Sequence, residues 1–361
     1  MVTPLSRPVL TVDLEALSIN YKALAALAAP AETAVVVKAD AYGIGLEPAA
    51  RALHAAGART FFVAQAPEGA ALRRILGPGP IILTLNGFST ADTAETAAFD
   101  LVPCLCSPAQ IAAFRAAFGA SRPCALHFET GINRLALTPK DLVALRADPP
   151  RDLNVILLMS HLACADDPSA EMNGRQHKHF SDRVADLSQL FPGARRSLAA
   201  TGGILLGPAH HFDLVRAGIG LYGGMPYADA RPVVALHAPL LQVREISAGE
   251  TIGYSATWTA QRPSRIGVLP LGYADGFHRT TQGARVWVEG RPAPVVGRVS
   301  MDMITVDLTD LPEPAPGALA EILGPHQTVD ALAAHAGTLG YEVLTGLGRR
   351  YERRHLGAPA G

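Results

Sequence analysis

The chain has 361 residues, of which 49% are hydrophobic and 17% are charged, and its formal net charge is −1. The apolar fraction is that of a globular protein, and the low charge density argues against a disordered chain. The balanced charge argues against a nucleic-acid coat protein or a polybasic membrane binder. The length predicts two domains, or one barrel with a smaller unit attached.

The sequence carries no sign of export or of membrane insertion. Residues 1–10 contain two prolines and no long apolar run, which is not the pattern of a signal peptide. No stretch approaches the roughly 18 apolar residues that a spanning helix needs. The four cysteines form no Cys-x-x-Cys pair, and a disulfide scaffold would need a higher density. We therefore expect a reduced, cytoplasmic protein without a membrane partner.

Short apolar or β-branched runs alternate with amphipathic segments over the first 225 residues. Asp13 is placed to cap the first amphipathic segment. The alternation predicts a parallel α/β fold, and eight runs favour a closed (β/α)8 TIM-like barrel over an open sheet. The runs are 35–38, 61–63, 81–85, 101–105, 125–128, 155–159, 196–200 and 212–215. The segments with helical spacing are 14–28, 46–56, 68–76, 90–99, 109–118, 139–146 and 175–190.

The pattern changes near residues 225–232. From residue 233 onward, hydrophobic and polar residues alternate with period two between closely spaced Gly and Pro, which is typical of an antiparallel β domain. We predict a barrel domain over residues 1–230 and a C-terminal antiparallel β domain over residues 231–361, with one helix at 328–336. The alternating runs are 240–246, 251–259, 265–270, 284–288, 293–299 and 303–308.

Lys38 closes the first predicted strand and precedes Ala-Asp-Ala-Tyr42-Gly43-Ile-Gly45. Parallel α/β barrels carry their chemistry where strands end. Desolvation at a barrel mouth would lower the pKa of this lysine and suit a Schiff base with an aldehyde cofactor. A lysine that extends from the strand end into solvent explains the position equally well.

Later strand ends carry further polar residues and glycines. Backbone N–H groups of glycine-rich turns can hold a phosphate. Arginine is one recognised partner for the pyridine nitrogen of pyridoxal phosphate. Taken singly, each of these residues is also explained by a structural histidine or an ordinary turn. The segments are His127-Phe-Glu129-Thr-Gly131-Ile-Asn-Arg134, Ser160-His161, Thr201-Gly202-Gly203 and Arg216-Ala-Gly218-Ile219-Gly220.

Two other features of the sequence are ambiguous when considered separately. Tyr273 lies in Gly272-Tyr273-Ala-Asp-Gly276, and spacing alone favours an ordinary turn tyrosine. The adjacent His210 and His211 would point to opposite faces of a strand, so we expect no metal site there.

Together these segments resemble the alanine racemase family over essentially the whole chain. The lysine loop followed, later in the chain, by Gly-Tyr-Ala-Asp-Gly is highly specific. The resemblance implies a barrel that binds pyridoxal 5'-phosphate, a C-terminal β domain and a head-to-tail homodimer with shared active sites. The other matching segments are Val12-Asp-Leu-Glu-Ala-Leu, Thr130-Gly131…Arg134-Leu, Ser160-His161-Leu-Ala, Arg216-x-Gly-Ile-x-Leu-Tyr-Gly and Val296-Gly-Arg298-Val-x-Met301-Asp302.

The resemblance also implies a role for each matching residue. Lys38 would hold the cofactor as an internal aldimine and handle the proton of the D-isomer, and Tyr273 of the other subunit would handle that of the L-isomer. His161 would bond to that tyrosine, and Arg216 would face the pyridine nitrogen. The remaining contacts implied are Tyr42, Thr201, Gly218 and Ile219 to the phosphate, Arg134 to the phenolic oxygen and the substrate, and backbone of Met301 to the substrate carboxylate.

Three positions depart from the family pattern. His127 stands where many members have a carbamylated lysine, so His127 or an anion beside it is a candidate for holding Arg134. Glu129 replaces an Asp, and Ala200 replaces an Asn.

The implied activity is the interconversion of L-alanine and D-alanine, for peptidoglycan or for alanine catabolism. The near alternative is a serine or broader-specificity racemase. A non-catalytic pyridoxal-phosphate carrier and a decarboxylase of the same plan are more distant alternatives.

Overall fold

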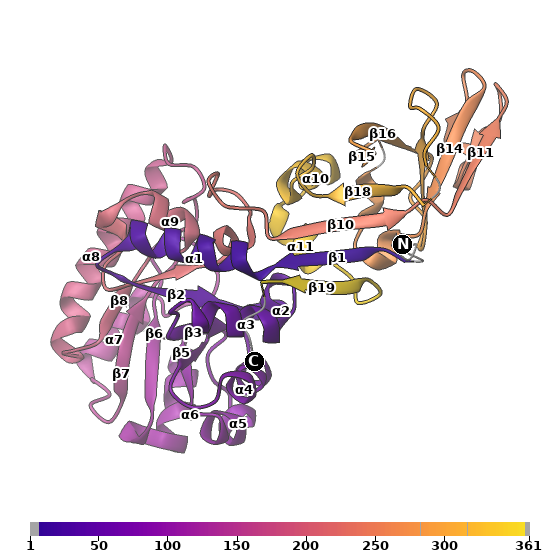
Figure 1. Cartoon of the computed structure of the whole chain (residues 1–361). Coiled ribbons are helices and arrows are strands. Elements are labelled where there is room, and N and C mark those ends of the chain that lie inside the picture. Colours follow the sequence, from indigo (N-terminus) through magenta and orange to yellow (C-terminus); the bar gives the residue numbers. More distant parts are fainter. Residues whose placement is uncertain (1–6, 282, 316, 358–361) are drawn as a thin grey trace.

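The computed structural model describes residues 7–281, 283–315 and 317–357. Figure 1 shows a barrel with its covering helices on one side and a β sheet on the other. The long strands β1 (Val9–Asp13), β10 (Val234–Pro239) and β19 (Glu352–Leu356) run between these two parts. The predicted combination of a parallel barrel and an antiparallel β domain is confirmed.

The barrel is one parallel sheet in the order β8-β7-β6-β5-β4-β3-β2-β9. An isolated parallel bridge between Ala200 and Arg216 lies just beyond β8, so the two ends of the sheet nearly meet. Each run predicted from the sequence overlaps one of these strands. Their bounds are β2 (Glu32–Val36), β3 (Thr60–Val63), β4 (Ile81–Thr84), β5 (Leu101–Leu105), β6 (Pro123–His127), β7 (Asn154–Met159), β8 (Arg195–Ser197) and β9 (Leu214–Ala217).

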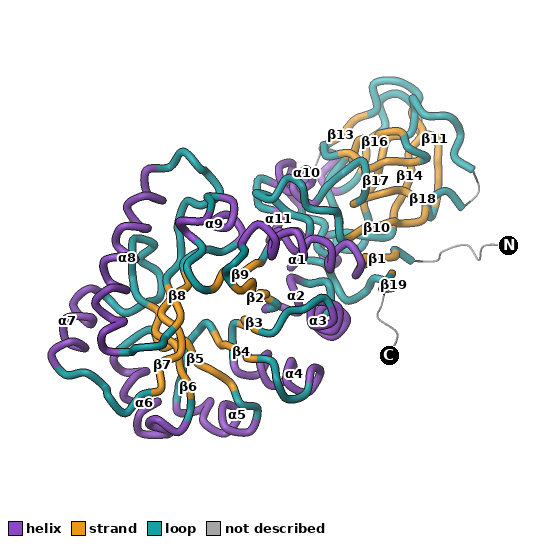
Figure 2. Tube along the Cα trace, turned by 60° about the vertical axis from the view of Figure 1, so that its left-hand side comes forward, coloured by secondary structure: helices purple, strands orange, loops and turns teal. Residues whose placement is uncertain are grey.

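Helices cover the outside of the barrel (Figure 2). Asp13 caps the first of them as predicted, because its Oδ1 accepts a hydrogen bond of 2.8 Å from Ala16 N. α9 is only one turn long. The helices are α1 (Leu14–Ala28), α3 (Leu46–Ala55), α4 (Ala66–Leu76), α5 (Thr93–Ala98), α6 (Pro108–Phe118), α7 (Pro139–Ala147), α8 (Glu171–Leu190) and α9 (Thr201–Leu205). None of the described helices is both long and apolar enough to cross a membrane.

The second sheet has nine strands in the order β11-β14-β17-β16-β15-β18-β10-β1-β19. Strand β1 pairs antiparallel with β10 and parallel with β19. The sequence-based division placed residues 9–13 in the barrel domain, whereas β1 belongs to this sheet; the boundary at 230 and 231 stays a prediction. The other strands are β11 (Gln242–Ile246), β14 (Ser264–Leu269), β15 (Arg285–Val288), β16 (Arg291–Val296), β17 (Ile304–Asp307) and β18 (Leu319–Leu323).

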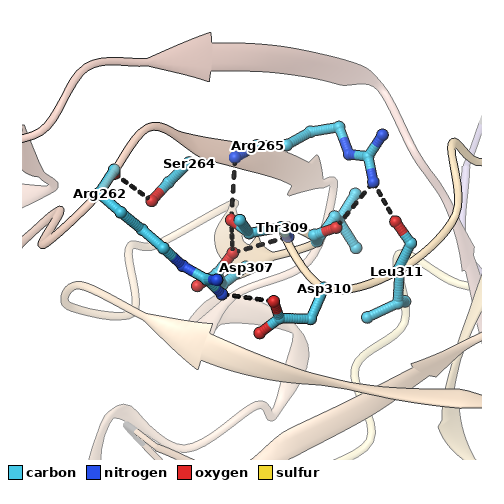
Figure 3. Close-up of polar contacts among 8 residues, drawn as sticks. Arg262, Ser264, Arg265, Asp307, Thr309, Asp310 and Leu311 are labelled. Carbon is cyan, nitrogen blue, oxygen red and sulfur yellow. Dashed lines mark hydrogen bonds and ion pairs between the residues drawn. The ribbon is translucent and has the colours of Figure 1, made fainter.

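Polar contacts fix β14 against β17 at one end of this sheet (Figure 3). Arg265 N donates to Thr309 Oγ1 over 3.0 Å, and Thr309 N donates to Asp307 Oδ1 over 2.9 Å. An Arg262–Asp310 ion pair lies beside them. These contacts hold the register in which Ile266 is opposite Asp307. The small sheet of β12 (Thr251–Ile252) and β13 (Trp258–Thr259), and the helices α10 (Val329–Ala336) and α11 (Gly340–Thr345), complete this domain.

Candidate active site

Lys38 begins a left-handed turn at the carboxyl end of β2. This turn, α2 (Lys38–Tyr42), has φ values of 52–56° at residues 39–42. A left-handed conformation costs an L-residue roughly 1–2 kcal/mol, and such strain is concentrated at functional sites. Glu68 Oε1 accepts from Ala39 N over 2.7 Å, and Asp40 Oδ1 accepts from Leu46 N over 2.7 Å. These bonds fix the turn, so the position of Lys38 is set by the surrounding structure.

The Lys38 side chain is half-buried, and its pKa is lowered from the usual value. Burial is the main cause, the positive charge of Arg134 adds to it, and the carboxylate of Glu68 opposes it. A lowered pKa increases the fraction of neutral amine, which is the form that attacks a carbonyl carbon or accepts a proton.

Arg216 lies inside the barrel, only 3% exposed, and its two terminal nitrogens are held by several acceptors. Nη1 donates to Ser197 Oγ over 2.6 Å, and Nη2 donates to Ser160 O over 2.8 Å. Its Nε makes no hydrogen bond to any residue that the structure describes. Burial lowers the pKa of Arg216 to about 10, so the guanidinium remains charged near neutral pH.

His161 is a neutral histidine with a defined tautomer. Its Nδ1 lies 3.2 Å from Arg216 Nη2, and because arginine has only donors, Nδ1 must accept. The ring hydrogen is therefore on Nε2. Burial, and then the charge of Arg216, hold the pKa of His161 well below its usual value. His161 therefore offers its Nε2–H as a hydrogen-bond donor, while the positively charged Arg216 is bonded to the other ring nitrogen.

Thr201 joins the ends of β8 and β9. Its Oγ1 accepts from Gly218 N over 3.0 Å and from Gly220 N over 3.3 Å. A Cβ on Gly218 would lie 2.8 Å from the Tyr42 hydroxyl, so glycine allows these two residues to approach this closely. The Tyr42 ring stacks on Tyr222 with centroids 4.5 Å apart. The structure thus brings together the predicted phosphate contacts Tyr42, Thr201 and Gly218, with Ile219 next in the chain.

His127 is the last residue of β6 and is buried, at 7% exposed. Its Nε2 is buried and has no hydrogen-bond partner among the described residues, and its Nδ1 lies 3.8 Å from Cys106 Sγ. Burial, Arg216 and Arg134 lower the pKa of His127 to about 3, so the ring is neutral. No hydrogen bond within the described ranges joins His127 to Arg134, which is exposed. The structure gives no direct support for the expectation that His127 holds Arg134.

Tyr273 and Met301 lie in the other domain. Tyr273 begins the short helix η6 (Tyr273–Asp275) and is 45% exposed, and Met301 is 52% exposed. Tyr273 N donates to Ser300 O, and Ala274 N donates to Met301 O, both over 3.1 Å. Their turns therefore form one unit. No hydrogen bond in the described part of the chain connects this unit to Lys38, His161 or Arg216.

The sequence analysis did not identify three residues that lie near the lysine turn. The Tyr341 ring lies 6.0 Å from the Tyr42 ring, and its pKa is raised, mainly by burial. Glu68 holds the turn as described, and Arg353 Nη1 donates to Gly43 O over 2.8 Å. Tyr341 and Arg353 come from the C-terminal segment, and nothing local in their sequence indicates contact with residues near position 40.

Fold and site together define a parallel α/β barrel with a half-buried lysine of lowered pKa just after β2, joined to a C-terminal β domain. Comparisons with known proteins identify the family. Residues 12–226 match the family model described as "Alanine racemase, N-terminal domain", and residues 233–355 match "Alanine racemase, C-terminal domain". The chain belongs to the alanine racemase family.

Individual relatives agree with this assignment. An alanine racemase from Cereibacter sphaeroides (strain ATCC 17029) is 51% identical over 353 residues, which is 96% of this chain and 97% of that protein. A crystal structure of alanine racemase from Bartonella henselae with covalently bound pyridoxal phosphate is 36% identical, with a TM-score of 0.92, and the match covers 98% of this chain and 100% of that one. The biosynthetic alanine racemase from Pseudomonas aeruginosa is 38% identical, with a TM-score of 0.89 over 98% and 100% of the two chains. The predicted family and fold class are confirmed, and the serine or broader-specificity alternative is not favoured.

Proposed function

We propose that this chain interconverts L-alanine and D-alanine with pyridoxal 5'-phosphate bound covalently to Lys38, using Lys38 and Tyr273 of the partner subunit as two bases. The observation that carries the proposal is the half-buried Lys38, with its lowered pKa, at the mouth of a barrel that also holds the Arg216–His161 pair. Curated relatives whose sequences are 51% and 49% identical to this chain carry the name alanine racemase, which supports alanine as the substrate.

The residues present fit this cofactor. Gly218 brings backbone close to the Tyr42 hydroxyl, because a Cβ at this position would lie only 2.8 Å from that hydroxyl. Arg216 Nε–H is without a partner among the described residues, which suits a ring nitrogen. We assign Tyr42, Thr201, Gly218 and Ile219 to the phosphate, and Lys38, Arg134, His161 and Arg216 to the rest of the cofactor. When bound, pyridoxal phosphate supplies a conjugated system that delocalises negative charge from Cα.

Arg216 determines the protonation of whatever nitrogen faces it. A guanidinium keeps its own proton near neutral pH, because its pKa is still about 10 in this buried position. A ring nitrogen placed opposite Arg216 would therefore accept a hydrogen bond and stay unprotonated. Arg216 would thereby limit how far negative charge is drawn away from Cα, which would favour return of the proton to Cα over side reactions such as transamination.

Racemisation requires two bases because the proton leaves one face of Cα and returns to the other. We assign removal of the Cα proton of D-alanine to the Lys38 amine, and removal of the Cα proton of L-alanine to the Tyr273 phenolic oxygen. His161 presents Nε2–H with the Arg216 cation behind it. This donor would stabilise the Tyr273 oxygen in its ionised form, which a tyrosine base requires. Backbone of Met301 and the Arg134 guanidinium are assigned to the substrate carboxylate.

We infer a head-to-tail homodimer in which the β domain of one subunit covers the barrel mouth of the other. Tyr273 and Met301 share one exposed unit, and Tyr254 is 70% and Met303 is 47% exposed on the same domain. Apolar exposure of this kind is typical of a surface that a second protein covers. We also expect a cytoplasmic location, since Cys104, Cys106 and Cys124 are buried free thiols.

Spectroscopy and complementation test the proposal. Lys38→Ala should abolish the long-wavelength absorbance of the lysine-bound cofactor, and a retained band would contradict the assignment of Lys38. Lys38→Ala and Tyr273→Phe homodimers should both be inactive. When equal amounts are mixed and reassembled, half of the dimers contain one intact site, so about one quarter of the wild-type activity should return. No recovery, in a mixture shown to exchange subunits, would mean that both bases come from the same chain.

A further inference from the structure

The unit that carries Tyr273 and Met301 is held by a carboxylate buried inside it. Asp275 closes the Tyr273 turn and is only 2% exposed. Its Oδ2 accepts from Gly272 N over 3.0 Å. A buried carboxylate needs a cation and further hydrogen bonds to offset its loss of hydration. The partner of Asp275 therefore determines whether this turn is stable.

Arg350 is that partner, and it joins the two turns. Its Nε donates to Asp275 Oδ1 over 2.7 Å, and its Nη2 donates to Asp275 Oδ2 over 2.6 Å. Its Nη1 donates to Asp302 Oδ1 over 2.6 Å. Asp302 directly follows Met301. One planar guanidinium thus fixes a carboxylate two residues after the proposed base and another beside the proposed substrate contact. A lysine could not reproduce this geometry.

The chain on either side of Arg350 is anchored to the same turn. Gly348 N donates to Asp275 O over 3.1 Å, and Tyr351 Oη donates to the same oxygen over 2.6 Å. Arg353, three residues further along, bonds to Gly43 after the lysine turn. Arg350 is therefore presented from a fixed segment that contacts both the lysine turn and the Tyr273 turn of one subunit.

The Tyr273 side chain depends on this support. Its ring is 45% exposed, and its hydroxyl makes no hydrogen bond to a residue in the described part of the chain. Within one subunit, the position of the ring is set by its turn rather than by contacts of its own. A shift of the turn would move the proposed base relative to Cα, and small displacements of a reacting group are costly in rate.

We propose that Arg350 is a positioning residue for racemisation: by joining Asp275 and Asp302, it holds Tyr273 and Met301 at the spacing that the L-isomer requires. This inference rests on the proposed function. Arg350 acts through the two aspartates and touches no reacting atom itself. Its effect should fall on the step that Tyr273 performs and spare the step that Lys38 performs.

Deuterium isotope effects at Cα separate these two steps. In the L-to-D direction the label is removed by Tyr273, and in the D-to-L direction it is removed by Lys38. We expect Arg350→Gln to lower kcat about 10- to 100-fold, as misplacement of a reacting group does. The isotope effect should rise with [2-2H]-L-alanine and should not rise with [2-2H]-D-alanine. Absorbance of the bound cofactor should match that of the wild type.

Two further variants keep the test decisive if Arg350→Gln folds poorly. Asp302→Ala removes only the side-chain link between Arg350 and the Met301 turn, because the Arg350–Asp275 pair remains, and it should shift the isotope effects in the same sense by less. Arg115→Gln removes an exposed ion pair with Asp152 far from these turns and should leave both isotope effects unchanged.

The outcomes distinguish this inference from the function on which it rests. If wild-type enzyme shows no racemisation, the proposed function fails. If wild-type enzyme racemises alanine and the Arg350 and Asp302 variants lose rate with both isotope effects unchanged, Arg350 is a structural residue and the inference is overturned.

Discussion

Thr201→Val tests the hydrogen bonds by which Thr201, after β8, holds the glycine-rich turn after β9. The assignment of the phosphate contacts depends on these bonds. Thr201 is 2% exposed, and its Oγ1 is the acceptor for Gly218 N at 3.0 Å and for Gly220 N at 3.3 Å. Valine has nearly the same shape but no acceptor, so two buried N–H groups would lose their partner. A buried donor without a partner costs about 1–3 kcal/mol. Because the second bond is long, we expect a loss of about 2–4 kcal/mol in the free energy of unfolding.

Thr201→Ser is the matched control. Serine keeps the acceptor and removes one buried methyl group, which costs about 0.5–1.5 kcal/mol. Urea unfolding of the cofactor-free proteins should be compared at one protein concentration, since oligomerisation contributes to stability. We expect the valine variant to be the less stable of the two and to bind pyridoxal phosphate more weakly. A valine variant at least as stable as the serine variant would refute the role given to Oγ1.

Three further changes test the electrostatics and the lysine turn. Arg134→Gln removes a charge that lowers the pKa of Lys38, so the pH midpoint for the rate of cofactor capture should move up; an unchanged midpoint would contradict this cause. Gly43→Ala places a Cβ against a backbone carbonyl of α11 at φ +82°, whereas Gly337→Ala at φ +71° meets nothing within 4 Å; only the first should weaken cofactor binding in a titration. Folding lowers the pKa of His127 from 6.5 to about 3, so the unfolded chain binds more protons between these values, and stability decreases as the pH is lowered through this range. His127→Gln should flatten the pH dependence of urea stability between pH 6 and 4 by up to about 1.4 kcal/mol per pH unit, and an unchanged slope would mean that His127 is not held neutral.

The barrel could be predicted from the sequence because the patterns that specify its strands, helices and helix caps are local in the chain. Every strand of the barrel except β8 contains a short apolar run, and most helices have their own periodicity and often their own cap, as at Asp13. The place of β1 could not be predicted in this way. It pairs with β10 and β19, which lie more than 200 and 300 residues away in the sequence, and no local pattern encodes such a pairing. The left-handed geometry of α2 was also beyond reach, since Ala39, Ala41 and Tyr42 belong to residue types that rarely adopt it.

The residues of the candidate site also fall into those that local sequence could identify and those that it could not. Lys38, His161 and Arg216 could be selected because strand ends of a parallel barrel meet at one face, and the structure brings His161 and Arg216 to 3.2 Å. Tyr341 and Arg350 could not be selected. Their contacts with Tyr42 and Asp275 cross from the C-terminal segment to distant turns, and the sequence around Arg350 is also that of an ordinary solvated basic patch. Tyr273 stands between these cases, because the family motif identified it while its spacing alone favoured a turn residue.

The central claim is that the chain moves the Cα proton of alanine between two faces. Purified protein with pyridoxal phosphate should be incubated with L-alanine in D2O, and optical rotation and the Cα proton signal should be followed together. We predict that both decay to zero, as Lys38 and Tyr273 exchange the proton with solvent on opposite faces. If the Cα signal decays while rotation persists, only one face is served and the two-base account is wrong. If neither decays while the cofactor absorbance is present, alanine is not the substrate.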